Sequence, residues 1–214
     1  SLLTPNGIWV LEQSYLPLMI KNNAFDTICH EHIEYYKIKD IINIVERVGM
    51  KVFNVFINDV NGGSFRLICC KKDAKHSVNH NVHSLLDEEI QFFSDENVYN
   101  EFNKRVLSIK NELKALLQEL KEKNINVYGL GASTKGNVLL QYFEINQNLI
   151  KAIGEVNPEK FGKYTPGSNI PIIDQDEILT DESAYFLILP WHFKDFFINS
   201  DRFKKNNLIF PLPQ

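Results

Sequence analysis

The C-terminal half of the sequence predicts an open α/β fold with a mainly parallel sheet and helices on both faces. Beyond Asn124, short apolar runs typical of strands alternate with helical patterns. A glycine-containing loop follows the first of these runs, where a strand gives way to a helix. Strands separated by helices need right-handed crossover connections, so they pair in parallel. Together these observations predict a Rossmann-like domain.

The elements of this half follow from the same patterns. Apolar runs predict strands at residues 126–130, 150–156, 171–173, 184–189 and 207–210. Helical spacing predicts helices at residues 135–143 and 193–198.

The N-terminal half combines strands with amphipathic helices. Strands are expected at residues 7–12, 51–60 and 64–71, with Asn61-Gly62-Gly63 as a hairpin-like connection between the last two. A brief helix or turn is expected at residues 16–22, and an amphipathic helix runs from Lys39 until Gly49 stops it. Residues 72–84 are expected to form a polar loop, and residues 85–123 to be mostly helix. The apolar face of this last helix is predicted to hold Val106, Leu107, Ile109, Leu113, Leu116, Leu117 and Leu120.

Composition excludes several classes of protein. The 214 residues are 44% hydrophobic, which supports a proper core, and the formal net charge of −4 gives no overall basic field for nucleic acid. No apolar run approaches the roughly 18 residues of a membrane helix. Three cysteines without CxxC spacing favour a reducing cytoplasm over a disulfide framework. We therefore expect a cytoplasmic protein that binds neither nucleic acid nor a membrane.

A cluster of titratable groups stands at residues 25–36, FDTICHEHIEYY. Its histidines and glutamate suit a metal site, an acid/base pair or a structural role, and the residues alone leave all three open. Extended backbone would put His30 and His32 on one face and Glu31 on the other. The histidines of the later polar loop, His76, His80 and His83, have no cysteine or carboxylate at ligand spacing, so we expect a solvated loop there and no metal in this chain.

The glycine loop VYGLGASTKGN, residues 127–137, stands where a phosphate site belongs in such a fold. The pyrophosphate candidates are Ser133, Lys135, Gly136 and Asn137. The dinucleotide fingerprint is broken because Thr134 holds its third glycine position, and the spacing of a Walker A loop is absent. A nucleotide or phosphate ligand is favoured over a mere tight turn with a helix cap.

Further ligand candidates follow the next strand. Glu155 ends this strand, about where a ribose-binding carboxylate stands in an NAD site. The loop NPEKFGKYTPGSN, residues 157–169, leaves the same sheet edge and is either a ligand loop or a surface excursion. From these segments we expect Glu155, Asn157, Lys160 and Tyr164 around a ribose and base.

The order of the segments is more specific than any single motif. A strand ending in Glu12, then NNAFDTICHEHIEYY, NGGSFR, VYGLGASTKGN, EVNPEKFGKYTPGSNIPI and LILPWHF resembles the C-terminal part of the sugar C-methyltransferase family, over nearly the whole chain. The resemblance implies methylation of a carbon of a nucleotide-linked keto-deoxysugar by S-adenosylmethionine.

The resemblance also implies a domain plan. Residues 1–24 would be the end of a class I methyltransferase domain, residues 25–60 the catalytic motif with a helical connection, and residues 61–214 the Rossmann-like nucleotide-sugar-binding domain. S-adenosylmethionine would bind mainly to an N-terminal domain that this sequence lacks, and zinc to a four-cysteine module that is also missing. The partner would be a nucleotide-diphosphate sugar, while the oligomeric state stays open.

The family motif Tyr-His-Glu-His assigns roles to the cluster. His32 would be the base that removes the proton α to the ketone, and Glu31 its partner near the sugar. Cys29 stands where the family has tyrosine, so a weakly donating thiol replaces a phenol, and with His30 it would contact the substrate.

Two further residues complete the expected binding site. Arg66 would add a bidentate contact or form a surface ion pair, and Trp191 would wall the pocket or pack in the core. The alternatives to the enzyme are a nucleotide-sugar binding module without catalysis and, with less support, an NAD-dependent oxidoreductase.

Overall fold

The structure is a computed structural model that describes residues 2–212, and the chain forms two compact units. Unit 1 consists of residues 1–24 and 34–102, and unit 2 of residues 25–33 and 103–214. The chain therefore leaves unit 1 for nine residues, which belong to unit 2, and then returns.

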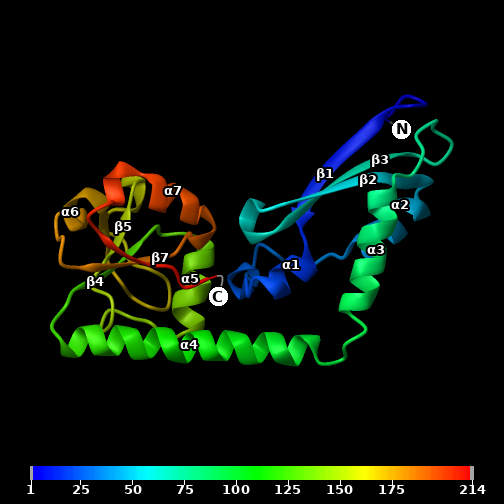
Figure 1. The fold of residues 1–214 in the computed structure, drawn as a ribbon. Coiled ribbons are helices and arrows are strands. Elements are labelled where there is room, and N and C mark those ends of the chain that lie inside the picture. The colour runs from blue at the N-terminus through cyan, green and yellow to red at the C-terminus, as the bar shows by residue number, and fades with distance from the viewer. Residues whose placement is uncertain (1, 213–214) are drawn as a thin grey trace. The chain divides into compact units, whose positions relative to one another are not determined.

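Unit 1 is built on a three-stranded antiparallel sheet (Figure 1). Its strands are β1 (Ile8–Ser14), β2 (Met50–Asn58) and β3 (Ser64–Lys71), in the order β1-β3-β2. Because β3 runs antiparallel to both neighbours, β1 and β2 run parallel to each other. Within the described residues, β1 pairs on one edge only.

Helices cover one face of this sheet. They are α1 (Leu16–Lys21), α2 (Ile38–Arg47) and α3 (His80–Phe92), and a short 3-10 turn, η2 (Val60–Gly62), connects β2 to β3. The core of unit 1 draws on the inner sheet face, α2 and α3, and contains Ile38, Ile41, Val45, Val52, Val55, Phe65, Leu67, Cys69, Val82 and Leu85.

A buried carboxylate ties α3 to the start of α2. The Glu89 side chain is 3% exposed, and it accepts the backbone N–H groups of Ile38 and Lys39 at 2.8 and 3.2 Å. The hydroxyl of Tyr15 donates to it at 3.2 Å. Glu89 therefore satisfies amides at the N-terminus of α2 that have no partner within that helix.

The expected elements between residues 72 and 123 need a correction. Instead of a polar loop followed by one helix, α3 begins at His80, inside the predicted loop, and a break at residues 93–97 precedes α4 (Val98–Glu122). Leu107 and Leu116 of the predicted apolar face are 40% and 36% exposed. The buried stripe of α4 consists of Val106, Ile109, Leu113, Leu117 and Leu120.

Unit 2 confirms the predicted parallel sheet. It contains β4 (Val127–Leu130), β5 (Ile153–Glu155), β6 (Ile172–Asp174), β7 (Tyr185–Ile188) and β8 (Asn207–Ile209). All pairings are parallel, and the order is β6-β5-β4-β7-β8. Numbered from β4, this is the order 3-2-1-4-5 of a Rossmann sheet.

Short helices connect these strands (Figure 1). The α-helices are α5 (Thr134–Tyr142), α6 (Gln175–Leu179) and α7 (Lys194–Asn199), and α6 was not expected from the sequence. The 3-10 turns are η1 (Phe25–Thr27), η3 (Pro158–Lys160), η4 (Trp191–Phe193) and η5 (Asp201–Phe203).

The two units differ from the predicted domain plan. Residues 1–24 are not a separate piece, because β1 pairs with β3 along its whole length, Ile8 opposite Cys70 through to Ser14 opposite Ser64. The predicted boundary at residues 60/61 falls inside unit 1, in the connection between β2 and β3. The chain passes from unit 1 to unit 2 within α4, after Phe102.

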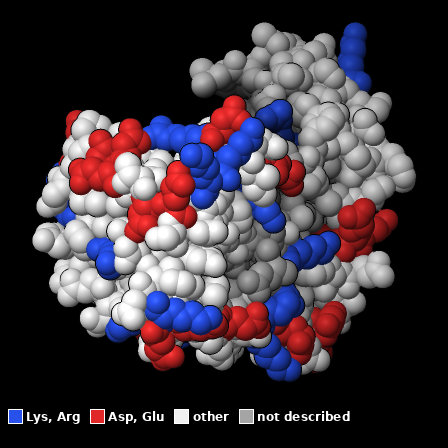
Figure 2. Space-filling model, turned by 60° about the vertical axis from the view of Figure 1, so that its left-hand side comes forward, with Lys and Arg blue, Asp and Glu red and all other residues white. Residues whose placement is uncertain are grey.

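The surface carries mixed charge. On the face drawn in Figure 2, lysine and arginine side chains are interspersed with aspartate and glutamate. Two ion pairs join α4 to the residues that follow α5: Lys110 and Lys114 bind Glu144 at 2.9 and 2.8 Å. Among the described helices, none is both long and apolar enough to cross a membrane.

Candidate active site at the carboxyl edge of the parallel sheet

The strand order of unit 2 defines where a ligand belongs. From the central strand β4 the chain moves outward to β5 and β6, and then crosses back to β7 on the other side of β4. In open α/β sheets ligands bind at this reversal, beyond the carboxyl ends of the two strands. Here that position lies between the loop after β4, which starts at Gly131, and the loop after β7, which contains Pro190 and Trp191.

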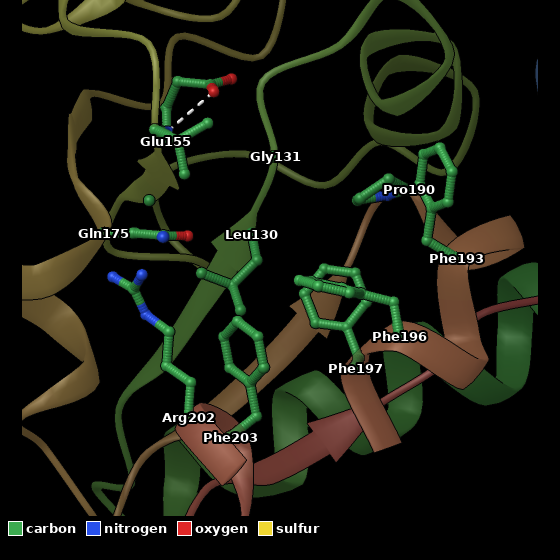
Figure 3. Close-up of a pocket in the computed structure, with 12 residues that line it drawn as sticks. Leu130, Gly131, Glu155, Gln175, Pro190, Phe193, Phe196, Phe197, Arg202 and Phe203 are labelled. Atoms are coloured by element: carbon green, nitrogen blue, oxygen red, sulfur yellow. Dashed lines mark hydrogen bonds between the residues drawn. The ribbon is translucent and has the colours of Figure 1, made fainter. Parts of the chain in front are cut away.

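A cavity of about 380 Å³ opens at this edge, and we call it the crevice cavity. It is lined by Leu130, Gly131, Gly154, Glu155, Val156, Gln175, Pro190, Phe193, Phe196, Phe197, Arg202 and Phe203. Figure 3 shows phenylalanine rings on one side and the polar ends of Gln175 and Arg202 on the other. An apolar pocket with few polar groups is typical of sites for small molecules.

The glycines of the loop after β4 are required by packing. Gly131 has a φ of +84°, and a Cβ atom there would lie 2.9 Å from Cδ of Pro190. A Cβ atom on Gly136 would lie 3.0 Å from Cβ of Leu189. These glycines let the loop and α5 approach the end of β7 closely, which explains them without a phosphate. Ser133 caps α5, because its hydroxyl accepts the Gly136 N–H at 3.1 Å.

Glu155 fills the position expected for a ribose-binding carboxylate, but its acceptors are used by the protein. It accepts the backbone N–H groups of Ala132, Val156 and Asn157 at 2.9, 2.8 and 3.1 Å, and the Lys160 ammonium at 3.2 Å. Burial acts to raise the pKa of Glu155, but these donors outweigh it and hold the pKa below its usual value. Four donors match the capacity of a carboxylate, so Glu155 fixes the glycine loop and has no acceptor left for ribose hydroxyls.

The motif segment, residues 25–33, packs against α5 and the loop after β7. The Phe25 ring stacks on Phe143 with centroids 4.9 Å apart and lies 5.4 Å from the ring of Tyr142. The Asp26 carboxylate accepts the indole N–H of Trp191 at 2.7 Å. The motif therefore reaches the switch point of the parallel sheet through contacts within unit 2.

The cluster itself forms a turn. The N–H of His32 donates to the carbonyl of Cys29 at 3.0 Å, so the backbone here forms a turn and does not place the two histidines on one face of an extended segment. Glu31 lies at the N-terminus of α5 and accepts the Thr134 hydroxyl at 3.3 Å. The His30 side chain is 82% exposed, and its Nε2 lies 4.0 Å from Oε1 of Glu31.

A second cavity, of about 690 Å³, lies beside this turn, and we call it the motif cavity. It is lined by Ile28, Cys29, His30, Thr134, Asn137, Val138, Gln141, Tyr142 and Pro166. The motif and the start of α5, which lie about a hundred residues apart in sequence, therefore share one cavity.

Three titratable groups of unit 2 that burial affects, Asp26, Lys135 and His192, lie near one another, because Lys135 interacts with each of the other two. Burial raises the pKa of the Asp26 carboxyl, although the Trp191 hydrogen bond and Lys135 oppose the rise. Burial lowers the pKa of Lys135, against the opposing effect of Asp26 and Cys29. Burial, with the Lys135 charge, lowers the pKa of His192 to about 4, so this imidazole is neutral at physiological pH. Among the described side chains of unit 2, Asp26 Oδ1, Asn137 Oδ1 and His192 Nδ1 are buried without a hydrogen-bond partner.

The metal alternative has a geometric basis. Cys29, Glu31 and His32 each offer a ligand atom, and these three atoms lie within 4.8 Å of one another. Sulfur, carboxylate and imidazole ligands together suit zinc. However, Glu31 is exposed and the Lys135 ammonium acts on Cys29 from nearby, which disfavours a cation. All three cysteines of the chain are free thiols.

The other predicted site residues are scattered. Arg66 lies in unit 1, on β3, and forms an ion pair with Glu12 at 2.7 Å, while Tyr164 is 61% exposed. Asn157 caps η3 through its side chain, and Trp191 is 3% exposed and bound to Asp26.

Sequence reasoning missed Gln175, Arg202 and the phenylalanine rings of the crevice cavity, and it also missed Asp26. Asp26 stands inside the quoted motif, and its acidic side chain next to Phe25 was the signal available. The partner that makes Asp26 informative, Trp191, lies 165 residues away.

The fold and the site define a Rossmann-like ligand-binding domain. Comparison with known proteins identifies its family: the chain belongs to the C-methyltransferase family. Residues 59–213 match the C-methyltransferase C-terminal domain. The chain is also 32% identical over 223 residues to the C-methyltransferase NovU of Streptomyces niveus. That alignment covers all of this chain and 52% of the relative, so the chain spans about half the length of the curated relative that it matches.

Proposed function

We propose that this chain is the substrate-binding and base-supplying part of a C-methyltransferase that acts on a nucleotide-linked keto-deoxysugar. The observation that carries the proposal is the position of the motif segment. Its Glu31 bonds to the first residue of α5 at the ligand-binding edge of a parallel sheet, and its Cys29 and His30 line the motif cavity. A fold of this type binds nucleotides at that edge, and the motif brings titratable groups to it.

His32 is the proposed general base. Methylation of a carbon beside a ketone requires removal of the α proton, and neutral imidazole accepts a proton near physiological pH. The turn that bonds His32 to Cys29 and the contact of Glu31 with Thr134 fix the cluster next to the cavity. Glu31 would hold the sugar or assist the imidazole, and the Cys29 thiol would contact the substrate as a weak donor.

The nucleotide would occupy the glycine-loop side of the site. Its base fits the crevice cavity, where the phenylalanine rings offer stacking and Gln175 and Arg202 offer hydrogen bonds (Figure 3). Gly131 lines the crevice cavity and Thr134 lines the motif cavity, so the short turn between them separates the two. Ser133, Lys135 and Asn137 are on or beside this turn, and they remain the proposed diphosphate contacts.

The methyl donor in this proposal is S-adenosylmethionine, which methyltransferases generally use and which would supply the transferred methyl group. The glycine loop of unit 2 does not fit its adenosine, because the Ala132 amide and the Glu155 carboxylate bind each other. The same contact counts against the NAD-dependent oxidoreductase. We therefore place the donor on a further domain, together with the zinc module implied by the resemblance.

The sheet of unit 1 supports a connection to such a domain. Its order β1-β3-β2, with a parallel outer pair, is compatible with the end of a larger sheet in which β1 would pair with one more strand. Ile8, Val10 and Phe56, which share the outer face of this sheet, are 48%, 49% and 50% exposed. We propose that the methyl-donor domain pairs with the edge of β1 and covers the exposed apolar face of this sheet. The enzyme would be cytoplasmic.

Two measurements test the proposal. Calorimetry on this chain should show binding of a thymidine or similar diphosphate sugar and no binding of NAD; the reverse preference would favour the oxidoreductase. In the full-length protein, His32→Ala should abolish carbon methylation and leave nucleotide binding intact. His30→Ala is the matched control, because the exposed His30 ring should be dispensable for proton removal.

Wild-type turnover in His32→Ala would show that the base is wrongly assigned. Sugar-nucleotide binding without any methylation by the wild-type protein would favour the binding module, the alternative that the thiol of Cys29 suggests.

A further inference from the structure

We infer that Asp26 is a positioning residue of the catalytic turn, acting through its hydrogen bond to Trp191. Asp26 is fully buried and its Oδ2 accepts the Trp191 indole N–H at 2.7 Å. It does not reach solvent and does not line either cavity, so it has no access to substrate. The inference rests on the proposed function, because the turn it would position carries the proposed base.

The Asp26–Trp191 hydrogen bond joins two segments that lie 165 residues apart in the sequence. Trp191 is the first residue of η4 and closely follows the end of β7 at Ile188. Because β7 pairs with the central strand β4, the position of Trp191 is tied to the middle of the sheet. Asp26 belongs to η1, three residues before Cys29. The Asp26–Trp191 bond, at 2.7 Å, is shorter than the 3.3 Å bond between Thr134 and Glu31 of the same segment. A hydrogen bond to an ionised carboxylate is about twice as strong as one between neutral groups.

Backbone hydrogen bonds connect the residues around Asp26 to the turn at residues 29–32. The Ile28 N–H donates to the Phe25 carbonyl at 2.9 Å, the Cys29 N–H to the Thr27 carbonyl at 3.0 Å, and the His32 N–H to the Cys29 carbonyl at 3.0 Å. Three residues between the anchor and the end of the turn, Ile28, Cys29 and His32, are thus each bonded to a residue two or three positions earlier. A loosened anchor would displace the imidazole, and a displacement of about 1 Å costs about a hundredfold in rate.

The chemistry of the pair makes the role specific. An ionised carboxylate without partners is costly to bury, and here the indole N–H and the nearby Lys135 charge reduce that cost without cancelling it. A phenylalanine or leucine would fill the same space but would not fix the orientation of η1. The buried carboxylate therefore selects one placement of the segment over others that packing alone would allow.

The first experiment needs no catalysis. The chain has two tryptophans, so a ¹⁵N-labelled sample gives two indole N–H signals. The signal of Trp191 should lie downfield and resist exchange in D₂O, whereas that of Trp9, which is 46% exposed, should exchange at once. Asp26→Ala should abolish the protection of Trp191 and raise hydrogen exchange at residues 28–32 at least about tenfold, with exchange in β4 and β7 unchanged.

Equal loosening of β4 and β7 would identify Asp26 as an ordinary core residue, and unchanged exchange at residues 28–32 would show that the anchor does not hold the turn. Either result overturns the inference. If Asp26→Ala fails to fold, Asp26→Asn and Trp191→Phe serve instead: the asparagine keeps an acceptor for the indole, while the phenylalanine removes the donor.

The second experiment uses the full-length protein. Trp191→Phe should lower kcat about 10- to 100-fold with KM changed less than about threefold, and Asp26→Asn should retain more activity than Trp191→Phe. Trp9→Phe is the control and should match the wild type. Equal losses in kcat and substrate affinity would contradict a positioning role. If the wild type itself lacks methylation, the proposed function fails, while the exchange result still decides whether Asp26 holds the turn.

Discussion

The buried imidazole of His192 should make the stability of unit 2 depend on pH. The pKa of this group is about 4 in the folded chain, against an ordinary value of 6.5. Between these values the unfolded chain binds more protons than the folded one, so stability falls as pH falls from about 6.5 to about 4. Above about pH 6.5 the contribution is fully present.

The magnitude follows from the shift. A difference of about 2.5 pH units corresponds to at most about 3.4 kcal/mol. His192 is only partly buried, and water screens its charge, so we expect about 1 to 2 kcal/mol. The raised pKa of Asp26 acts in the opposite sense, because that group destabilises the fold as it ionises with rising pH. A comparison of variants, rather than one pH profile, therefore isolates the histidine.

The assay is urea unfolding between pH 7.5 and 4.5 in a Trp9→Phe background, where Trp191 is the remaining fluorophore and reports unit 2. The difference in unfolding free energy between this protein and His192→Gln should change by about 1 to 2 kcal/mol over the range. His83→Gln, at an exposed position of unit 1, should leave the profile unchanged. Parallel profiles with and without His192 would refute the reasoning.

Three further substitutions test the packing of the units by chemical denaturation. Glu89→Ala should destabilise unit 1 by about 2 to 3 kcal/mol, and more than Glu89→Gln, because amides at the start of α2 lose their acceptor. Leu117→Ala should cost about 2 to 5 kcal/mol, since Leu117 is fully buried, whereas the 36% exposed Leu116→Ala should cost under about 1 kcal/mol; similar values would contradict the buried stripe. Gly131→Ala should cost about 1 to 3 kcal/mol and more than Gly162→Ala, because Gly162 also has a positive φ (+75°, against +84° at Gly131) but has open space where a Cβ atom would lie.

The parallel sheet was predicted well because each of its strands can be recognised from a few neighbouring residues. The strands of unit 2 are short apolar runs between turn residues, and each was placed within a few residues of its observed position. The five-residue α6 was missed, since one turn of helix after β6 has too few positions to show a period. The start of α3 at His80 was missed because its first turn is polar apart from Val82, and the next buried residue is Leu85.

The candidate site was predictable as a set of residues but not as an arrangement. The motif and the glycine loop both attracted attention through composition, and the structure brings them together at one cavity. Local sequence patterns do not show which hydrogen-bond donors each acceptor binds in the folded chain. Glu155 was expected to bind ribose, but it accepts the Ala132 amide. Trp191 was expected either to wall the pocket or to pack in the core, and the structure shows it buried with its indole N–H donated to Asp26. Both outcomes depend on contacts between distant segments.

The excursion of residues 25–33 has a consequence for dissecting this protein. No single cut in the gene separates the two units, because a fragment that starts at residue 103 lacks the segment that covers Trp191 and Phe143. Such a fragment would present an unpaired indole donor and an apolar surface to solvent. The motif would then have to be supplied by the other fragment as a separate molecule. Any engineered exchange of one unit between relatives must therefore carry two pieces of sequence, or it will separate the proposed base from the site it serves.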